Sequence, residues 1–199
     1  MEQTFMKEKK IIPLVLSMSL PMMLSMLVNS LYNIVDSYFV AQISEQAMTA
    51  LSLVYPLQLL ETAIAVGFGI GINAAAAFYL GAGERKNAND VVTSGTLLSI
   101  VHGIVLTLFS IGFARYFVGM FTDQQPILED AVKYAWIVFA FTIPNVVAIT
   151  FEKIFQAEGR MKVSMISMLC GCVVNIILDP MLIFGIGFFP KMGIAGAAL

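Results

Sequence analysis

The sequence predicts an all-α membrane protein, built as a polytopic helical bundle. Of its 199 residues, 59% are hydrophobic and 12% are charged, which is about half the charged share of an average soluble domain. The mean hydropathy is +0.87. The apolar residues gather in runs of at least about 20 residues, the length a helix needs to cross a bilayer. A soluble domain of this size would need more polar surface than this chain supplies.

Five complete apolar runs and one incomplete run define the expected helices. Several runs exceed the length of a single crossing, which predicts tilt or protrusion. The first run is too long for the apolar segment of a signal peptide and has no small-residue cleavage site, so we expect it to be retained. We expect helices at about residues 11–40, 47–80, 91–117, 127–155 and 161–189, and an incomplete sixth helix over 193–199.

Prolines and glycines interrupt several of these runs. A proline inside a soluble helix costs about 3 kcal/mol, but membrane helices tolerate it where neighbours satisfy the freed carbonyl. We therefore expect helices that can bend. A glycine-dense stretch in the second run predicts close helix packing and is not a nucleotide-binding motif, since no strand precedes it. The prolines are Pro21, Pro56, Pro144 and Pro180, and the glycines are Gly67, Gly69 and Gly71.

Basic residues at the ends of the runs predict the orientation in the membrane. Eight lie on the side of the N-terminus and three on the opposite side, so residues 1–10 are expected in the cytoplasm. We expect a multi-pass protein of the bacterial inner or plasma membrane, with Tyr116, Tyr134 and Trp136 in an outer aromatic belt. A net charge of −2 gives no basic field for nucleic acid. The eight are Lys7, Lys9, Lys10, Arg85, Lys86, Lys153, Arg160 and Lys162, and the three are Arg115, Lys133 and Lys191.

Three acidic residues fall at membrane depth: Asp36, Glu61 and Asp179. A charge at the centre of a membrane helix costs about 2.5–3.5 kcal/mol on insertion scales, so each needs a physical reason. Asp36 and Asp179 both fall in the outer halves of their helices and can lie at similar depth. No Lys or Arg lies at a matching depth to neutralise them.

Asp36 and Asp179 each follow an amide on the same helix face. Asn29, Asn33 and Asp36 are spaced i, i+4, i+7, and Asn175 and Asp179 are spaced i, i+4, which places each set on one face. Two facing carboxylates repel in apolar surroundings, so one must bind a proton or a cation must lie between them. Oxygen ligands without His or Cys suit Na⁺ or H⁺ rather than zinc.

An alternative interpretation is structural. Each aspartate can instead cap a helix broken by proline or bond to neighbouring backbone, and the dipeptide Asp179-Pro180 makes this credible. Glu61, with Gln58 one turn earlier, also has two interpretations. It is either a cavity acid that attracts cationic substrates or a protonated partner in an interhelical hydrogen bond. His102, the only histidine, is expected to be a packing residue.

Several segments carry a resemblance to a known family. They are S-L-P-M-M-L-S-M-L-V-N-S-L-Y-N-I-V-D ending at Asp36, G-A-G-E-R ending at Arg85, F-Q-A-E-G-R-M-K ending at Lys162, N-I-I-L-D-P ending at Pro180, and G-I-A-G-A-A-L ending at Leu199. In this order and spacing, the chain from about Ile11 onward resembles the N-terminal half of a MATE (multidrug and toxic compound extrusion) transporter of the MepA-like branch.

The resemblance implies a twelve-helix fold of two six-helix lobes around a central cavity. This chain would supply the N-terminal lobe, residues 11–199, with a truncated sixth helix and without the C-terminal lobe, so we expect it not to transport alone. Members of the family export cationic or amphipathic compounds by alternating access, in exchange for H⁺ or Na⁺ and without another cofactor. The expected partners are drugs or toxic cations and membrane lipid.

The resemblance also implies roles for individual residues. A cation site formed by an Asp on the first helix and an Asn and Asp four apart on the fifth maps to Asp36, Asn175 and Asp179, which agrees with the spacing argument. Tyr32 would line the cavity. Glu61 matches no position of the family pattern, so its role as a substrate-cavity residue, like those of Asn29 and Asn33, rests on its own sequence context.

Two other functions are alternatives to export. A lipid-linked saccharide flippase of the same superfamily is the alternative, but its cavity would need basic residues for a pyrophosphate head group. The sequence predicts no Lys or Arg within a membrane-spanning segment, which argues against such a cavity. An intramembrane enzyme would need a nucleophile and a base at one depth, and His102 has no evident partner. The sequence therefore predicts a transporter rather than an enzyme.

Overall fold

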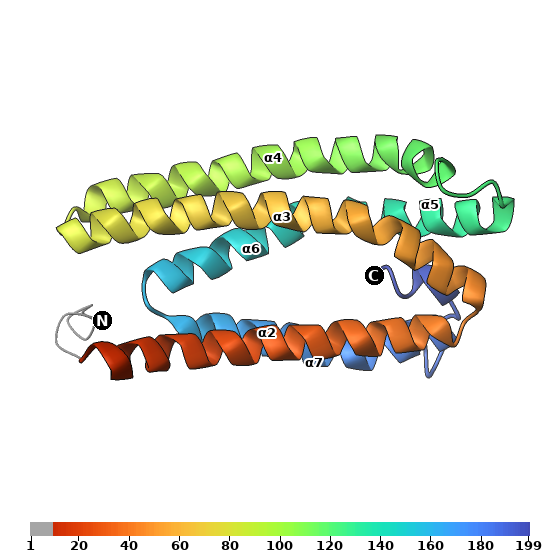
Figure 1. Ribbon diagram of the computed structural model, residues 1–199, viewed down its shortest axis with the longest axis horizontal. Helices are drawn as coiled ribbons and strands as arrows, with labels where there is room; N and C mark the ends of the chain where they lie inside the picture. The colour runs from red at the N-terminus through yellow and green to blue at the C-terminus, as the bar shows by residue number, and fades with distance from the viewer. Residues whose placement is uncertain (1–9) are drawn as a thin grey trace.

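The computed structural model describes residues 10–199 as a bundle of helices, which confirms the all-α fold (Figure 1). The predictions for residues 1–9, including Lys7 and Lys9, concern a part of the chain outside the described residues. The helices are α2 (Ile11–Ala41), α3 (Glu45–Ala82), α4 (Arg85–Gly119), α5 (Gln125–Ala140), α6 (Thr142–Ala157) and α7 (Met161–Phe184), followed by the 3₁₀ turn η1 (Gly193–Ala195). Four of them, α2, α3, α4 and α7, are each long and apolar enough to cross a membrane.

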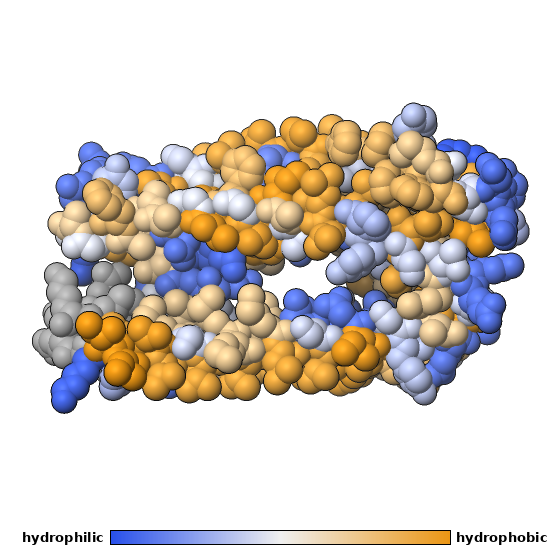
Figure 2. Space-filling model, viewed as in Figure 1, coloured by the Kyte–Doolittle hydropathy of each residue, from blue (hydrophilic) through white to orange (hydrophobic). Residues whose placement is uncertain are grey.

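The helices form two units. α3, α4, α5 and α6 pack closely on one another, whereas α2 and α7 pack mainly against each other. In Figure 1 the α2–α7 pair runs along the lower edge and α3 and α4 along the upper edge. Figure 2 shows an opening between the two units that is bordered by hydrophilic residues, while the outer faces are largely hydrophobic. We call these units the four-helix unit and the α2–α7 pair.

An apolar core joins the two units at one end, on the right in Figure 1. There the end of α2, the start of α3, the end of α4 and all of α5 bring buried side chains together with η1. Phe139, Val40, Val54 and Val118 are fully buried in this core, and Ile194 of η1 packs on it. The units are therefore held at this end and separate toward the middle of the molecule.

The helix expected over 127–155 is broken in the structure. α5 ends at Ala140, α6 begins at Thr142, and the two are bent by 49°. Pro144 explains the break, because it has no N–H to donate to the carbonyl of Ala140 and its ring clashes with that carbonyl. Taken together, α5 and α6 make a fifth candidate span. Pro21, Pro56 and Pro180 lie inside helices that continue past them.

The chain after α7 also departs from the expectation. α7 ends at Phe184 rather than near residue 189, because Gly185 adopts a left-handed conformation with φ of 74°. The chain then folds back, and the Met192 amide donates to the Leu182 carbonyl at 3.0 Å. Where a helix was expected over 193–199, the structure forms only η1 and turns. Gly196 lies against the backbone of Leu182, where a Cβ would come within 2.7 Å of its carbonyl oxygen.

Of the three glycines at which close helix packing was expected, only Gly69 lies close to another helix. At Gly69, a Cβ would lie 2.8 Å from Cγ of Lys153 on α6. At Gly67 and Gly71 a Cβ would meet nothing within 4 Å. A second close approach occurs at Gly95 of α4, where a Cβ would lie 2.7 Å from the side chain of Ile72 on α3. Gly69 and Gly95 thus set the separations of α3 from α6 and of α3 from α4.

Candidate functional site

A cavity of about 290 Å³ lies between the two units. The α2–α7 pair contributes one wall, and α3, α5 and α6 contribute the other. No Lys or Arg is among the described residues that line it. Its polar lining consists of Tyr32 and Asp36 from α2, Gln58, Glu61 and Thr62 from α3, Tyr134 from α5, Asn145 from α6 and Asn175 from α7.

Asn175 and Asp179 form a hydrogen-bonded pair on α7. With its amide nitrogen turned toward the carboxylate, Asn175 donates to Asp179 Oδ2 at 2.7 Å and to Oδ1 at 3.2 Å. Asp179 is buried, with 4% of its surface exposed. The i, i+4 spacing that the sequence showed therefore produces a direct contact. The carboxylate of Asp179 keeps acceptor capacity beyond this amide, since each carboxylate oxygen has two lone pairs.

Asp36 lies near Asp179, close enough for the two carboxylates to interact electrostatically. Asp36 is half-buried and lines the cavity from α2. Tyr32, one turn earlier, also lines the cavity and lies near both aspartates. The structure thus brings Tyr32, Asp36, Asn175 and Asp179 together at the α2–α7 pair. The atoms that these residues offer as ligands are carboxylate, amide and hydroxyl oxygens, which suit a hard cation or a proton.

Asn29 and Asn33 do not share this position. Both are exposed, and neither lines the cavity. The Asn33 side chain instead donates to the carbonyl of Asn29 at 2.8 Å. The spacing i, i+4, i+7 places these residues and Asp36 along a broad stripe of α2, but only the edge of that stripe at Asp36 and Tyr32 turns toward the cavity.

Glu61 lines the opposite wall. It is buried, with 4% of its surface exposed, and it projects from α3 toward α6. Thr142 and Asn145, at the start of α6, lie within hydrogen-bonding reach of its carboxylate. The cavity therefore carries carboxylates on both walls, with Asp36 on one side and Glu61 on the other.

Tyr134, Gln58 and Asn145 complete the polar lining. The sequence placed Tyr134 in an outer aromatic belt, but this was wrong: Tyr134 is 4% exposed and faces Gln58 inside the lobe. Trp136, two residues later, is half-exposed and donates from Nε1 to the Ile111 carbonyl at 3.3 Å. Asn145 could have been noticed as an amide at membrane depth directly after Pro144.

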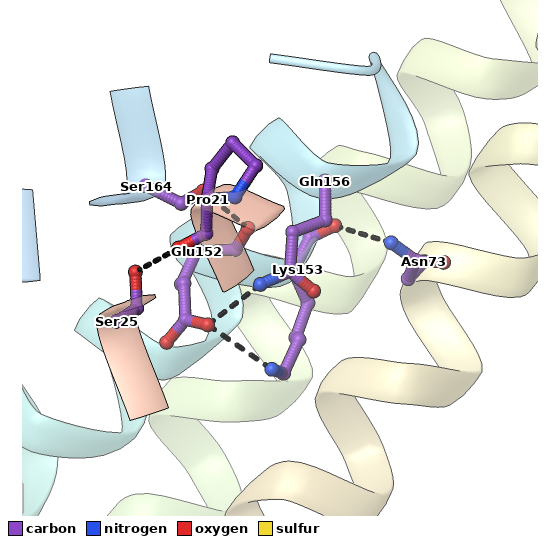
Figure 3. Close-up of polar contacts among 7 residues, drawn as sticks. All are labelled: Pro21, Ser25, Asn73, Glu152, Lys153, Gln156 and Ser164. Atoms are coloured by element: carbon purple, nitrogen blue, oxygen red, sulfur yellow. Dashed lines mark hydrogen bonds and ion pairs between the residues drawn. The ribbon is translucent and has the colours of Figure 1, made fainter. Parts of the chain in front are cut away.

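A second polar cluster closes the other end of the lobe, near the start of α7 (Figure 3). Lys153 Nζ pairs with Glu152 Oε1 at 3.1 Å, and Gln156 donates to the same oxygen at 2.7 Å. Asn73 of α3 donates to the Lys153 carbonyl at 2.6 Å, and Ser164 of α7 donates to the Glu152 carbonyl at 3.3 Å. The expectation that no basic residue lies within a span was wrong, because Lys153 is partly buried inside α6 and is neutralised there.

Comparison with known proteins agrees with this arrangement. The MatE family model matches residues 21–181. The multidrug export protein MepA of Staphylococcus haemolyticus is 30% identical over 200 residues, covering 100% of this chain and 43% of that protein. An FAD transporter of Shewanella oneidensis is 28% identical over 189 residues, covering 92% of this chain and 41% of that protein.

Solved structures show the same relationship. A MOP superfamily transporter from Pyrococcus furiosus superposes with a TM-score of 0.86 at 29% identity, covering 93% of this chain and 40% of that chain. An outward-facing multidrug resistance MATE family transporter gives the same values. The chain thus spans about two fifths of the length of the relatives it matches. Because the family model covers most of its residues, the chain belongs to the MatE family.

Proposed function

We propose that this chain forms the N-terminal lobe of a multidrug exporter, which exchanges cationic or amphipathic compounds for H⁺ or Na⁺ by alternating access. The observation that carries the proposal is the placement of Asp36 and Asn175 on one wall of a cavity that has no lining Lys or Arg, with the buried Asp179 hydrogen-bonded to Asn175. The proposed setting is the cell membrane, with the N-terminus in the cytoplasm. The membrane-spanning helices support this setting.

The coupling ion is proposed to bind between Asp36 and Asp179. Two neighbouring negative charges repel in surroundings of low dielectric constant, and a proton or a sodium ion removes the repulsion. Asn175 then has two roles: it holds the Asp179 carboxylate in place and offers its own carbonyl oxygen to a metal ion. Hard cations bind such oxygen ligands without His or Cys.

The division of the lobe into two units supports a conformational role for the ion. The ion site belongs to the α2–α7 pair, which packs loosely on the four-helix unit beside the cavity. Binding that draws α2 and α7 together alters the wall that faces the exported compound. Pro21 gives α2 a point at which to bend. The ion shifts this equilibrium only by its difference in affinity for the two conformations.

The cavity lining favours cationic over anionic substrates. The relative from Shewanella oneidensis is named as an FAD transporter, and a pyrophosphate needs basic or N–H donors. Here the lining offers two carboxylates, Asp36 and Glu61, and no Lys or Arg. The same absence among the lining residues argues against a lipid-linked saccharide. The drug export named for MepA fits the lining better.

The test is drug accumulation in bacteria that express the complete transporter, with external Na⁺ and pH varied independently. We expect lower accumulation of a lipophilic cation such as ethidium in expressing cells. We also expect accumulation to rise when the favourable Na⁺ or H⁺ gradient is removed. Equal accumulation in expressing and control cells would contradict export. Export that does not change when the Na⁺ and H⁺ gradients are removed would contradict ion coupling at Asp36 and Asp179.

A further inference from the structure

Glu61 is a buried acid that the proposed ion site does not use. It lies on α3, in the four-helix unit, whereas Asp36, Asn175 and Asp179 lie on the α2–α7 pair. Glu61 and Asp36 nevertheless line the same cavity. One cavity therefore has two separate carboxylate positions on its two walls.

The side chains around the Glu61 carboxylate are polar. Thr142 and Asn145, at the start of α6, lie within hydrogen-bonding reach of it, and Thr142 is 1% exposed. Gln58 and Thr62, on the same helix as Glu61, also line the cavity. Glu61 is therefore a buried acid in a polar cavity wall that α3 and the start of α6 form together.

The same wall also carries aromatic side chains that can contact a cation. Phe141 and Tyr134 line the cavity beside Glu61, and aromatic faces attract ammonium groups by cation–π interaction. A buried carboxylate together with aromatic rings is the usual chemistry for recognising a quaternary ammonium ion. The Glu152 carboxylate is different, because Lys153 and Gln156 already occupy it.

We propose that Glu61 is a second cation-binding residue, which holds the charged centre of the exported compound on the four-helix unit while Asp36 and Asp179 hold the coupling ion on the α2–α7 pair. This rests on the proposed function and adds the position of the charged centre of the substrate. The two positive charges then have separate positions on the two walls. The alternative, in which Glu61 serves only as an interhelical hydrogen-bond partner, gives no role to its charge.

The test measures binding to the purified complete transporter in detergent by calorimetry. The probes are benzyltrimethylammonium, a quaternary cation, and N,N-dimethylbenzamide, a neutral compound of similar size. In Glu61→Gln we expect the affinity for the cation to fall by about tenfold to a hundredfold, the usual range for a lost charged contact. Binding of the neutral probe should stay within about twofold. Glu61→Asp should recover part of the cation affinity, because it restores the charge.

Ion binding is followed separately as protection of α7 backbone amides in hydrogen exchange when Na⁺ or acid is added. Glu61→Gln should keep this protection and Asp36→Asn should lose it. Glu129→Gln is the matched control, since it removes an exposed carboxylate distant from this cavity, and both affinities should be unchanged. Thr142→Val probes the same wall without altering charge and should weaken cation binding by less than Glu61→Gln.

The outcomes separate this inference from the proposed function. If the unmodified transporter binds the cation and Glu61→Gln binds it equally well, the inference is wrong and the proposed function stands. If Glu61→Gln loses binding of the cation and the neutral probe alike, Glu61 is a structural residue and the inference is again wrong. If the unmodified transporter binds no cation, both fail.

Discussion

Asp36 and Glu61 line one cavity from two helices, α2 and α3, that belong to different packing units of the lobe. The chain reverses between these helices at the Gln42–Ser44 turn, where Ser44 caps α3 by accepting from the Ala47 amide at 3.0 Å. The apolar core fixes the units at that end. Asp36 and Glu61 therefore face one cavity from two walls that this core joins.

The first prediction concerns Asp36. Asp36→Asn keeps the shape of the side chain and removes its charge, so the repulsion that the coupling ion relieves disappears. We expect the affinity for Na⁺ or H⁺ to fall by about tenfold or more and ion-driven efflux to be lost, while a fluorescent cation still binds. The measurement is efflux from proteoliposomes under an imposed ion gradient.

Asn33→Ala supplies the control for Asp36. Asn33 lies on the same helix but is exposed and is not among the residues that line the cavity, and its side chain donates to the Asn29 carbonyl. Efflux in this variant should stay within about twofold of the unmodified protein, since exposed sites of this kind change stability little. Normal ion coupling in Asp36→Asn would rule out the proposed ion site.

The second prediction concerns the pair on α7. Asn175→Leu removes the amide that donates to Asp179 at 2.7 Å and leaves a buried carboxylate without that partner. We expect a loss of about 1–3 kcal/mol in the free energy of unfolding, together with weaker ion binding. Asn73→Leu also removes an amide hydrogen bond, the 2.6 Å bond to the Lys153 carbonyl, but far from the cavity. It should lower thermal stability and leave ion affinity unchanged, so equal ion affinity in both variants would contradict a specific role for Asn175.

Much of the geometry of the proposed ion site could be predicted from local spacing. Asn175 and Asp179 lie four residues apart on a helix that is apolar throughout, and a helix places such residues in contact. Tyr32 and Asp36 follow the same rule on α2, and both line the cavity. Polar groups in an apolar run are expensive, so their positions in the sequence already indicated a site. The packing of α2 on α7, which brings the two sets together, came only from the fold and the family resemblance.

The parts that could not be predicted depend on contacts between distant segments. Asn29 and Asn33 share a stripe with Asp36, but periodicity alone does not fix which edge of a stripe faces a neighbouring helix. Tyr134 looked like an interfacial aromatic because no pattern shows that Gln58 lies opposite it. Pro144 was one of four prolines at which a bend was expected, but no pattern in the sequence distinguishes it from the other three. Pro21, Pro56 and Pro180 sit in helices that stay continuous.

The third prediction separates two glycines of α3. Gly69→Ala places a methyl group 2.8 Å from Cγ of Lys153 and pushes α6 away, whereas Gly71→Ala meets nothing within 4 Å. Overpacking of this kind typically costs about 1–3 kcal/mol, while alanine in an open helix position gains up to about 1 kcal/mol over glycine. We expect thermal unfolding in detergent to shift downward for Gly69→Ala and to be unchanged or shift upward for Gly71→Ala. Equal shifts would show that the close approach of α3 and α6 is not required.

The last prediction concerns the bend between α5 and α6. Pro144 is the third residue of α6, where an N–H has no intrahelical partner unless the preceding helix continues. Pro144→Ala supplies an N–H that can bond to the Ala140 carbonyl, so we expect the 49° bend to decrease. Spin labels at positions 133 and 151, placed after Cys170 and Cys172 are replaced by Ser, should then move apart. Because Phe141 and Asn145 line the cavity at the bend, straightening should also weaken binding of benzyltrimethylammonium.

Pro56→Ala, in a helix that is already continuous, is the control and should change neither the distance between the spin labels nor the binding of benzyltrimethylammonium. A distance that stays the same in Pro144→Ala would mean that packing around Phe139, rather than the proline, sets the bend.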